Sequence, residues 1–109
     1  MKLAFTELPE AGIPHLNGGE GTVFARMYMD GHGKIMVSRL PQGASIGTHT
    51  HETSSEVNYV LSGQGAAECG GAEELLAPGD CHYCPKGSSH SIRNTGTEDL
   101  VLFTVVPEQ

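Results

Sequence analysis

Four side chains of the types that bind transition metals stand in two short stretches of the sequence. His49 and His51 form a His-x-His pair, Glu56 follows five residues later, and His90 lies in a later run. On a β-strand, side chains at positions i and i+2 point to the same face, so the pair would present two imidazoles side by side. Two ligands cannot complete a coordination sphere, and Glu56 and His90 are available as the third and fourth.

This set of side chains favours a particular class of metal. Three neutral imidazoles and one carboxylate suit a divalent transition metal (Fe, Mn, Ni, Zn, Cu or Co) better than Ca²⁺ or Mg²⁺. On a metal that prefers six ligands, four protein ligands leave positions for water, substrate or dioxygen. A His-x-His pair alone is weak evidence, because exposed histidines and hydrogen-bonded core histidines are common. Whether the pair binds a metal or consists of ordinary surface or core histidines is therefore judged from the residues around it.

Glycine and proline divide the chain into short runs of strand-forming residues. The sequence has 15 glycines and six prolines, and no long window carries a helical hydrophobic stripe. Runs of strand length and composition cover residues 23–29, 34–40, 56–62, 64–69, 80–84, 88–94 and 100–106, and we assign 72–77 as a further strand. Many short antiparallel strands between turns predict an all-β sandwich or barrel, jelly rolls included.

Two motifs within this framework resemble those of the cupin superfamily. Residues 43–63 match G-x5-H-x-H-x4-E-x6-G, and residues 79–94 match G-x5-P-x-G-x2-H-x3-N, with every fixed position present. The resemblance implies a small cupin, whose fold is the double-stranded β-helix, a jelly-roll barrel. It also implies one divalent metal at the mouth of the barrel, with four ligands: His49, His51, Glu56 and His90.

Chain length and the spread of strand signals leave no place for a domain boundary. A chain of 109 residues has the size of one domain. We assign residues 1–20 to an N-terminal arm or edge strand and residues 21–109 to the cupin barrel, within a single domain. By analogy with small cupins we expect a homodimer, with the apolar run 100–106 as a candidate interface.

The charge balance bears on partners and location. Six Lys and Arg against 13 Asp and Glu give a net charge of -7. This charge disfavours binding to nucleic acid and to an anionic membrane. The N-terminus lacks the long apolar stretch of a secretory signal, and no run approaches the length of a membrane span. We therefore expect a cytoplasmic protein.

A metal with these ligands would attract small anions. One divalent ion with three neutral histidines and one glutamate carries a local charge of about +1. Carboxylates or polyhydroxy compounds could chelate the open positions. Arg39 and Arg26 lie in predicted strands and are our candidates for pairing with a substrate carboxylate. Strand parity relative to His90 points Arg93 outward.

The remaining acidic and histidine residues are weaker candidates for metal ligands. Glu52 follows His51 directly, so strand parity turns it toward solvent. His15 and His32 lie in loops flanked by glycine or proline, and we expect no ligand role for them. His82 lies in a strand near the site and could either support a ligand or point outward.

Three cysteines, Cys69, Cys81 and Cys84, do not form a disulfide framework. The Cys-x-x-Cys pair lacks the second pair of a zinc ribbon and the following helix of a thioredoxin motif. We expect small buried apolar residues here, without thiol chemistry.

Three classes of function are compatible with this interpretation. The first is a metalloenzyme acting on a small oxygen-rich acid or sugar: an isomerase, a decarboxylase or an oxygenase, with the metal as Lewis acid or dioxygen site. The second is a non-catalytic protein that binds or senses a small anion. The third is a barrel in which the metal only stabilises the fold. Open coordination positions on the metal argue against this third class, because a purely structural site does not need them. The sequence favours the first but does not separate it from the second, and it names neither a substrate nor a catalytic residue.

Overall fold

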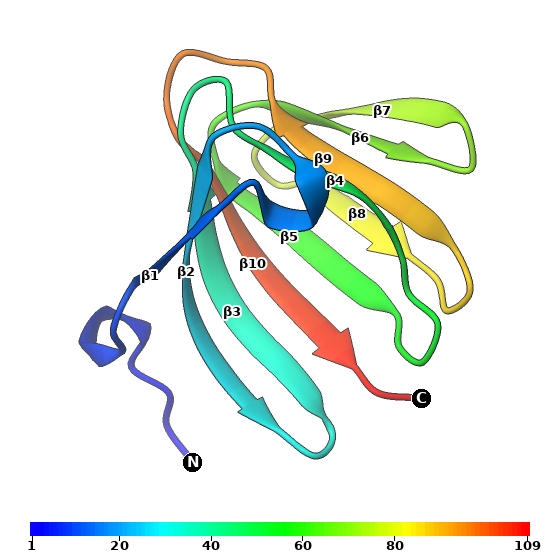
Figure 1. The fold of residues 1–109 in the computed structure, drawn as a ribbon. Coiled ribbons are helices and arrows are strands. Elements are labelled where there is room, and N and C mark those ends of the chain that lie inside the picture. The colour runs from blue at the N-terminus through cyan, green and yellow to red at the C-terminus, as the bar shows by residue number, and fades with distance from the viewer.

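The computed structural model describes all residues, 1–109, and is built almost entirely from antiparallel β-strands (Figure 1). The ten strands are β1 (Ala11–Pro14), β2 (Thr22–Asp30), β3 (Gly33–Leu40), β4 (Ser45–Thr50), β5 (Glu56–Ser62), β6 (Gly65–Cys69), β7 (Ala72–Leu76), β8 (Cys81–Cys84), β9 (Ser89–Asn94) and β10 (Leu100–Pro107). Two short 3-10 helices, η1 (Phe5–Glu7) and η2 (Leu16–Gly18), precede β2. No helix has the length and apolarity needed to span a bilayer.

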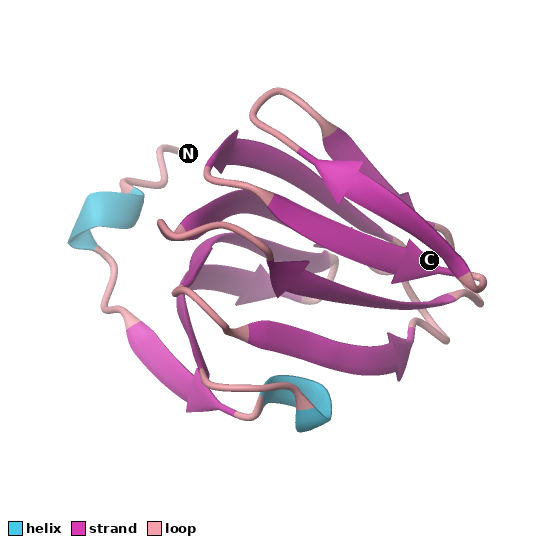
Figure 2. Cartoon of the chain, turned by 90° about the horizontal axis from the view of Figure 1, so that it is seen from above, coloured by secondary structure: helices cyan, strands magenta, loops and turns pink.

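The strands form two sheets that face each other (Figure 2). One has six strands in the order β1-β2-β3-β10-β5-β8, and the other has four in the order β4-β9-β6-β7. Strands distant in sequence are neighbours: β10 pairs with both β3 and β5, and β4 pairs with β9. This arrangement is the double-stranded β-helix, so the predicted all-β jelly-roll fold is confirmed. Residues 72–76 form β7, as their assignment to a strand predicted.

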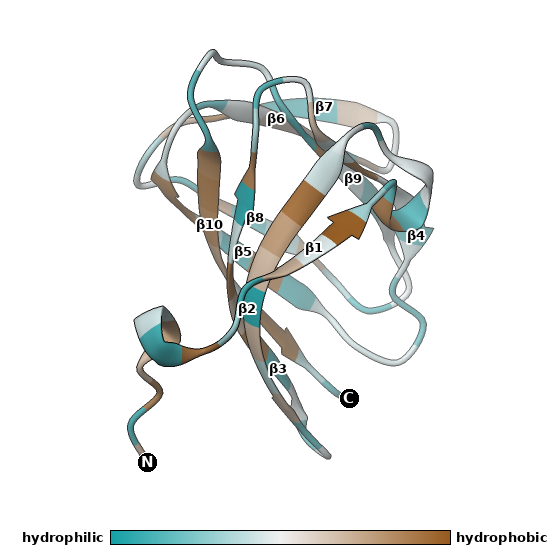
Figure 3. Ribbon diagram, turned by 60° about the vertical axis from the view of Figure 1, so that its left-hand side comes forward, coloured by the Kyte–Doolittle hydropathy of each residue, from teal (hydrophilic) through white to brown (hydrophobic).

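The core lies between the sheets and is built by alternation along the strands. In β10 the even-numbered residues from Leu100 to Val106 are buried, and the odd-numbered ones are only partly so. Because Val101, Phe103 and Val105 are also apolar, β10 is hydrophobic along most of its length (Figure 3). The aromatic ring of Phe5 covers part of this outer face, with its centroid 6.3 Å from that of Phe103.

The N-terminal residues are held on the barrel by main-chain contacts. Strand β1 is the edge of the six-stranded sheet and pairs with β2. The segment around η2 packs on β4 so closely that a Cβ added to Gly47 would lie 2.1 Å from the carbonyl oxygen of Asn17. A Cβ on Gly19 would lie equally close to the carbonyl oxygen of Ser45. Only glycine allows this approach at either position.

Candidate metal centre

The fold brings His49, His51, Glu56 and His90 together at one end of the barrel interior. His49 and His90 face each other across the β4–β9 pair, and His51 follows one residue after the end of β4. Glu56 is the first residue of β5, in the opposite sheet. One donor atom from each of the four lies within 4.8 Å of every other. The four residues therefore connect both sheets at a single point.

The donor atoms converge around Nε2 of His90. This nitrogen is 3.1 Å from Nε2 of His49, 3.0 Å from Nε2 of His51 and 3.1 Å from Oε2 of Glu56. Oε1 of Glu56 lies 3.3 Å from Nε2 of His51. His90 is fully buried and Glu56 is 8 % exposed. Two of the four side chains are thus buried, whereas His49 and His51 are partly exposed.

Hydrogen bonds behind the ligand atoms hold two of these side chains in orientation. Nδ1 of His49 donates to the carbonyl oxygen of Gly47 at 2.8 Å, because a carbonyl can only accept. Nε2 of His49 is therefore the ring nitrogen that points toward the cluster. Asn58 donates from Nδ2 to Oε2 of Glu56 at 2.8 Å and accepts a hydrogen bond from Thr104 at 2.7 Å.

The ionisation of Glu56 and His51 follows from their surroundings. Burial tends to raise the pKa of Glu56, but hydrogen bonds from His90 and Asn58, with the charges of His90 and His51, lower it to about 2. Burial lowers the pKa of His51, Glu56 opposes this effect, and the charges of His90 and His49 add to the lowering. At neutral pH the cluster therefore contains a carboxylate and at least one neutral imidazole.

Such a cluster needs a positive charge at its centre. Nε2 of His90 lies 3.1 Å both from Nε2 of His49 and from Oε2 of Glu56, and a metal cation would offset the repulsion among the lone pairs of these atoms. Three imidazoles and one carboxylate are the donor set that transition metals prefer. The residues present therefore fit a divalent transition metal, although nothing in the donor set distinguishes among Fe, Mn, Ni, Zn, Cu and Co.

Acid is expected to destabilise the metal-free protein in two steps. In the unfolded chain His51 takes up a proton near pH 6.5 and Glu56 near pH 4.5, whereas both pKa values are lower in the folded protein. The unfolded state therefore binds more protons, so the free energy of unfolding falls below about pH 6.5 and again between about pH 4.5 and 2. Urea titrations across this range measure the effect. Glu56→Gln should remove the second step and keep the first, and an unfolding free energy that is equally acid-sensitive in that variant would contradict the assignment.

A cavity of about 330 Å³ opens beside the cluster, and three of the four ligands line it. One wall is largely apolar, with Met27, Met36 and Ile46 among its residues. Lys34 is the only Lys or Arg among the lining residues, and its charge also contributes to the lowered pKa of His51. The cavity therefore combines the His and Glu cluster at its base with one cationic side chain and an apolar wall.

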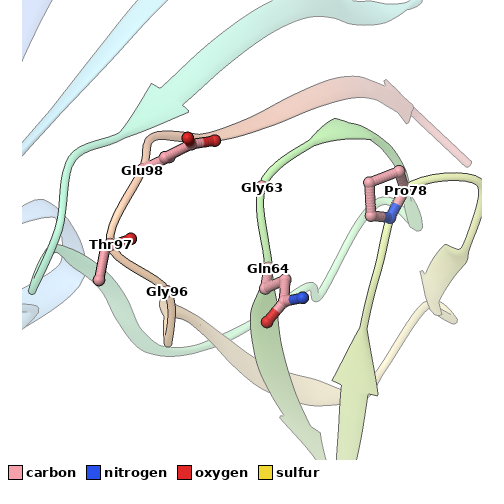
Figure 4. A pocket seen from close by; sticks show the side chains of 6 residues that line it. All are labelled: Gly63, Gln64, Pro78, Gly96, Thr97 and Glu98. Atoms are coloured by element: carbon pink, nitrogen blue, oxygen red, sulfur yellow. The ribbon is translucent and has the colours of Figure 1, made fainter.

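A second depression, of about 450 Å³, lies among loops at the other end of the strands (Figure 4). It is formed by the turns after β5, β7 and β9, and is lined by Gly63, Gln64, Pro78, Gly96, Thr97 and Glu98. It contains one acidic side chain and no histidine or cysteine, so it offers no comparable set of donors.

The structure places Arg39 and Arg26 on the outer face of the barrel, away from the cavity. Arg39 forms a two-pronged ion pair with Glu10 at 2.9 and 3.0 Å and lies over the ring of Phe24. Arg26 donates to the carbonyl of Leu8. Even-numbered residues of β3 and odd-numbered residues of β2 line the cavity, so strand parity turns both arginines outward. Neither of the two arginines expected to bind substrate lines this cavity, whereas Lys34 shares the inner face of β3 with Met36 and Ser38.

Of the other histidines, His82 is the one that the sequence left undecided, and it lies buried directly behind His90. Its Nε2 is 2.9 Å from Nδ1 of His90. The burial pattern of β8 alternates, so His82 and Cys84 point inward while Cys81 is exposed. Glu52 is exposed, as strand parity predicted, and none of Glu52, His15 and His32 joins the cluster.

The cysteines are all free. Cys84 is completely buried, and burial, together with neighbouring Cys69, raises its pKa to about 11. A thiol with so high a pKa is a poor nucleophile at neutral pH. The expected burial of the Cys-x-x-Cys pair is found at Cys84 but is wrong at Cys81, which is exposed because the alternation along β8 turns it outward.

Comparison with known proteins identifies the family of this chain. The cupin domain family matches residues 36–106. A Thermotoga maritima protein named oxalate-binding protein is 31% identical over 97% of this chain and 93% of its own length. An uncharacterized protein of Methanocaldococcus jannaschii is 33% identical over 59% of this chain and 51% of its own.

Solved structures extend the likeness to the whole fold. The crystal structure of a predicted oxalate decarboxylase from Thermotoga maritima superposes with a TM-score of 0.94, at 30% identity, covering 100% of both chains. A cupin domain from Schizosaccharomyces pombe superposes with a TM-score of 0.83 at 13% identity, covering 100% of this chain and 74% of that one, which shows the shared fold alone. With its motifs, double-stranded β-helix and matching relatives, this chain belongs to the cupin family.

Proposed function

We propose that this cupin binds one divalent transition metal through His49, His51, Glu56 and His90 and, on that metal, a small chelating carboxylate of the oxalate type. The observation that carries the proposal is the convergence of four donor groups beside a cavity whose one Lys or Arg side chain is Lys34. The name of the Thermotoga maritima relative, an oxalate-binding protein, makes oxalate the first ligand to test.

The charges of the cavity suit a dianion. A divalent metal held by three neutral histidines and one carboxylate retains about one positive charge, and Lys34 adds a second. A metal in this position would act as a Lewis acid toward a bound carboxylate. A chelating dicarboxylate would place one end on the metal, with its charge also met by the Lys34 ammonium group. The apolar wall, which includes Met27, Met36 and Ile46, would shield the bound ligand from bulk water.

Oxalate is expected to bind the metal-loaded protein and not the metal-free protein, and Lys34→Met should weaken this binding about 10- to 100-fold. The reason is the loss of one charge-assisted contact while the apolar part of the side chain is kept. Isothermal titration with the manganese- and zinc-loaded forms measures both effects. Lys86→Met removes the same charge from an exposed position near the C-terminus and should bind like wild type. Equal oxalate affinity with and without metal would sink the proposal.

A decarboxylase is the second candidate, favoured by the coordination positions that four protein ligands leave open. The structurally similar Thermotoga maritima protein is described as a predicted oxalate decarboxylase. Apart from the ligands themselves, Lys34 is the one titratable side chain that lines the cavity, so few groups are available to move a proton. We therefore rank binding first; formate production during long incubation with oxalate would reverse this order.

A cytoplasmic location and a homodimer stay predictions. The partly buried apolar residues Val101, Phe103 and Val105 on the outer face of β10 support the second, since a partner copy could cover what remains exposed of them.

A further inference from the structure

A row of three side chains runs from the surface of the barrel to the back of one ligand. His82, on β8, has a fully buried side chain, and its Nε2 lies 2.9 Å from Nδ1 of His90. Its other ring nitrogen, Nδ1, lies 2.7 Å from Oε1 of Glu74 on β7. The Glu74 side chain is 53% exposed. The row therefore joins a surface carboxylate to the atom of His90 that faces away from the other ligands.

The carboxylate at the outer end determines where each proton sits. A carboxylate only accepts hydrogen bonds, so Nδ1 of His82 carries the proton and donates to Glu74. In neutral His82 the other nitrogen, Nε2, is then an acceptor. Nδ1 of His90 must therefore donate to it. When a metal displaces the proton that Nε2 of His90 shares with Glu56, the Nε2 lone pair is then directed at the metal.

The geometry of the two rings supports this direction. The ring planes of His82 and His90 are inclined by only 19°, with centroids 5.2 Å apart. Together with the 2.9 Å N···N contact, this places the rings edge to edge, as an N–H···N hydrogen bond requires. His49 obtains the same orientation from a main-chain carbonyl, whereas His90 has no such partner and depends on the side chains behind it.

We propose that His82 and Glu74 are positioning residues of the metal centre. They hold His90 in the tautomer with Nδ1 protonated and aim its Nε2 at the metal. Histidine ligands are commonly oriented in this way by a second hydrogen-bonded group, and loss of that group typically weakens metal binding about 10- to 100-fold. The inference rests on the metal assignment made above and adds to it two residues from β7 and β8.

The test is the zinc affinity of matched variants, measured by competition with a chromophoric chelator. His82→Phe keeps a flat ring but removes both hydrogen bonds, and should weaken binding about 10- to 100-fold. His82→Gln supplies an acceptor for His90 and a donor for Glu74, and should recover part of that loss. Glu74→Gln should weaken binding by a smaller factor, because its amide can donate to His82 and so no longer enforces one tautomer.

The neighbouring Glu73 provides the control. It is exposed to a similar degree and pairs with Arg93 on the surface, so Glu73→Gln changes the same charge one residue away and should leave zinc affinity unchanged. The His90 Nδ1–H resonance in nitrogen-15 NMR of the zinc form gives a second readout, expected to be protected from exchange in wild type and exchange-labile in His82→Phe. A purely structural role would lower the thermal midpoint without these changes.

Two results would overturn the proposal. The first is zinc affinity within about twofold of wild type for both His82→Phe and Glu74→Gln, against the loss expected for a positioning group. If His82→Phe does not fold, Glu74→Gln, at a half-exposed position, decides alone. The second is a wild-type protein that binds no zinc, which would remove the metal assignment as well; unchanged variants of a zinc-binding wild type would remove only the role of His82 and Glu74.

Discussion

Replacing His49 by alanine is expected to abolish stoichiometric binding of a divalent transition metal. His49 supplies one of four converging donors, and its Nε2 lone pair is aimed at the others by the hydrogen bond from its own Nδ1 to Gly47. Removing a metal ligand should lower the metal affinity by more than the ~10- to 100-fold that is lost when only the hydrogen-bond partner of a ligand is removed. Elemental analysis after extensive dialysis should give about one equivalent for wild type and almost none for the variant.

The matched control is His32→Ala, which removes an imidazole from an exposed turn outside the cluster. This variant should retain the metal content of wild type. A His49→Ala protein that is folded by circular dichroism and still carries a full equivalent would show that the ligand set is different. Metal loss in both variants would point instead to adventitious binding by surface histidines.

Removal of the metal with a chelator is expected to lower the thermal midpoint by on the order of 10 °C or more. The ligands come from both sheets, with His49 and His90 on the four-stranded sheet and Glu56 on the six-stranded one. A bound ion therefore links the two sheets in the folded state alone. A metal ion present at about 1,000 times its dissociation constant adds roughly 4 kcal/mol to the free energy of unfolding. Each kcal/mol moves the thermal midpoint of a domain this small by about 4–8 °C.

Differential scanning calorimetry with and without chelator measures this shift. Metal-free wild type should also respond to added zinc or manganese by regaining the lost stability. His49→Ala should show no difference between the two conditions, since it has no ion to lose. Identical midpoints for wild type in both conditions would mean that no metal is bound tightly enough to connect the sheets.

The clustering of His49, His51, Glu56 and His90 and the fold could both be predicted from the sequence. The two cupin motifs carry their information in residue identity and spacing, which does not depend on knowing the tertiary structure. The strand runs were visible because β-branched and aromatic residues stand between glycines and prolines. Two strands escaped that pattern: β1 contains Gly12 and Pro14, and β4 is rich in serine, glycine and threonine. Their pairing with β2 and β9 outweighs poor intrinsic propensity.

The sequence did not show in the same way which Lys or Arg side chain lines the cavity. Alternation along β3 divides its residues into two faces, but local sequence does not reveal which face is the interior when both carry apolar residues. Arg39 follows the outward set and Lys34 the inward set. The signal that separates them is long-range, because it depends on which face of β3 meets the opposite sheet.

The role of His82 was undecided for a related reason. Its position in β8 gives an alternating pattern with Cys84, which suggests burial but names no partner. Its contacts come from β7 and β9, in the other sheet, and no spacing rule connects them. Buried polar residues find partners through tertiary packing, so their hydrogen bonds are the part of a site that sequence patterns describe least well.

The close docking of the N-terminal segment on β4 has a consequence for how this protein could diversify. Ile13, Leu16 and Asn17 line the cavity, yet the segment that carries them is fixed beside β4 by main-chain contact at Gly19 and Gly47. The side chains of Ile13 and Leu16 could therefore be exchanged while this main-chain contact stays, whereas Asn17, with a φ of 53°, favours asparagine or glycine. Because the four clustered residues lie elsewhere, on β4, β5 and β9 and directly after β4, substitutions in this segment would change one wall of the cavity without touching the cluster.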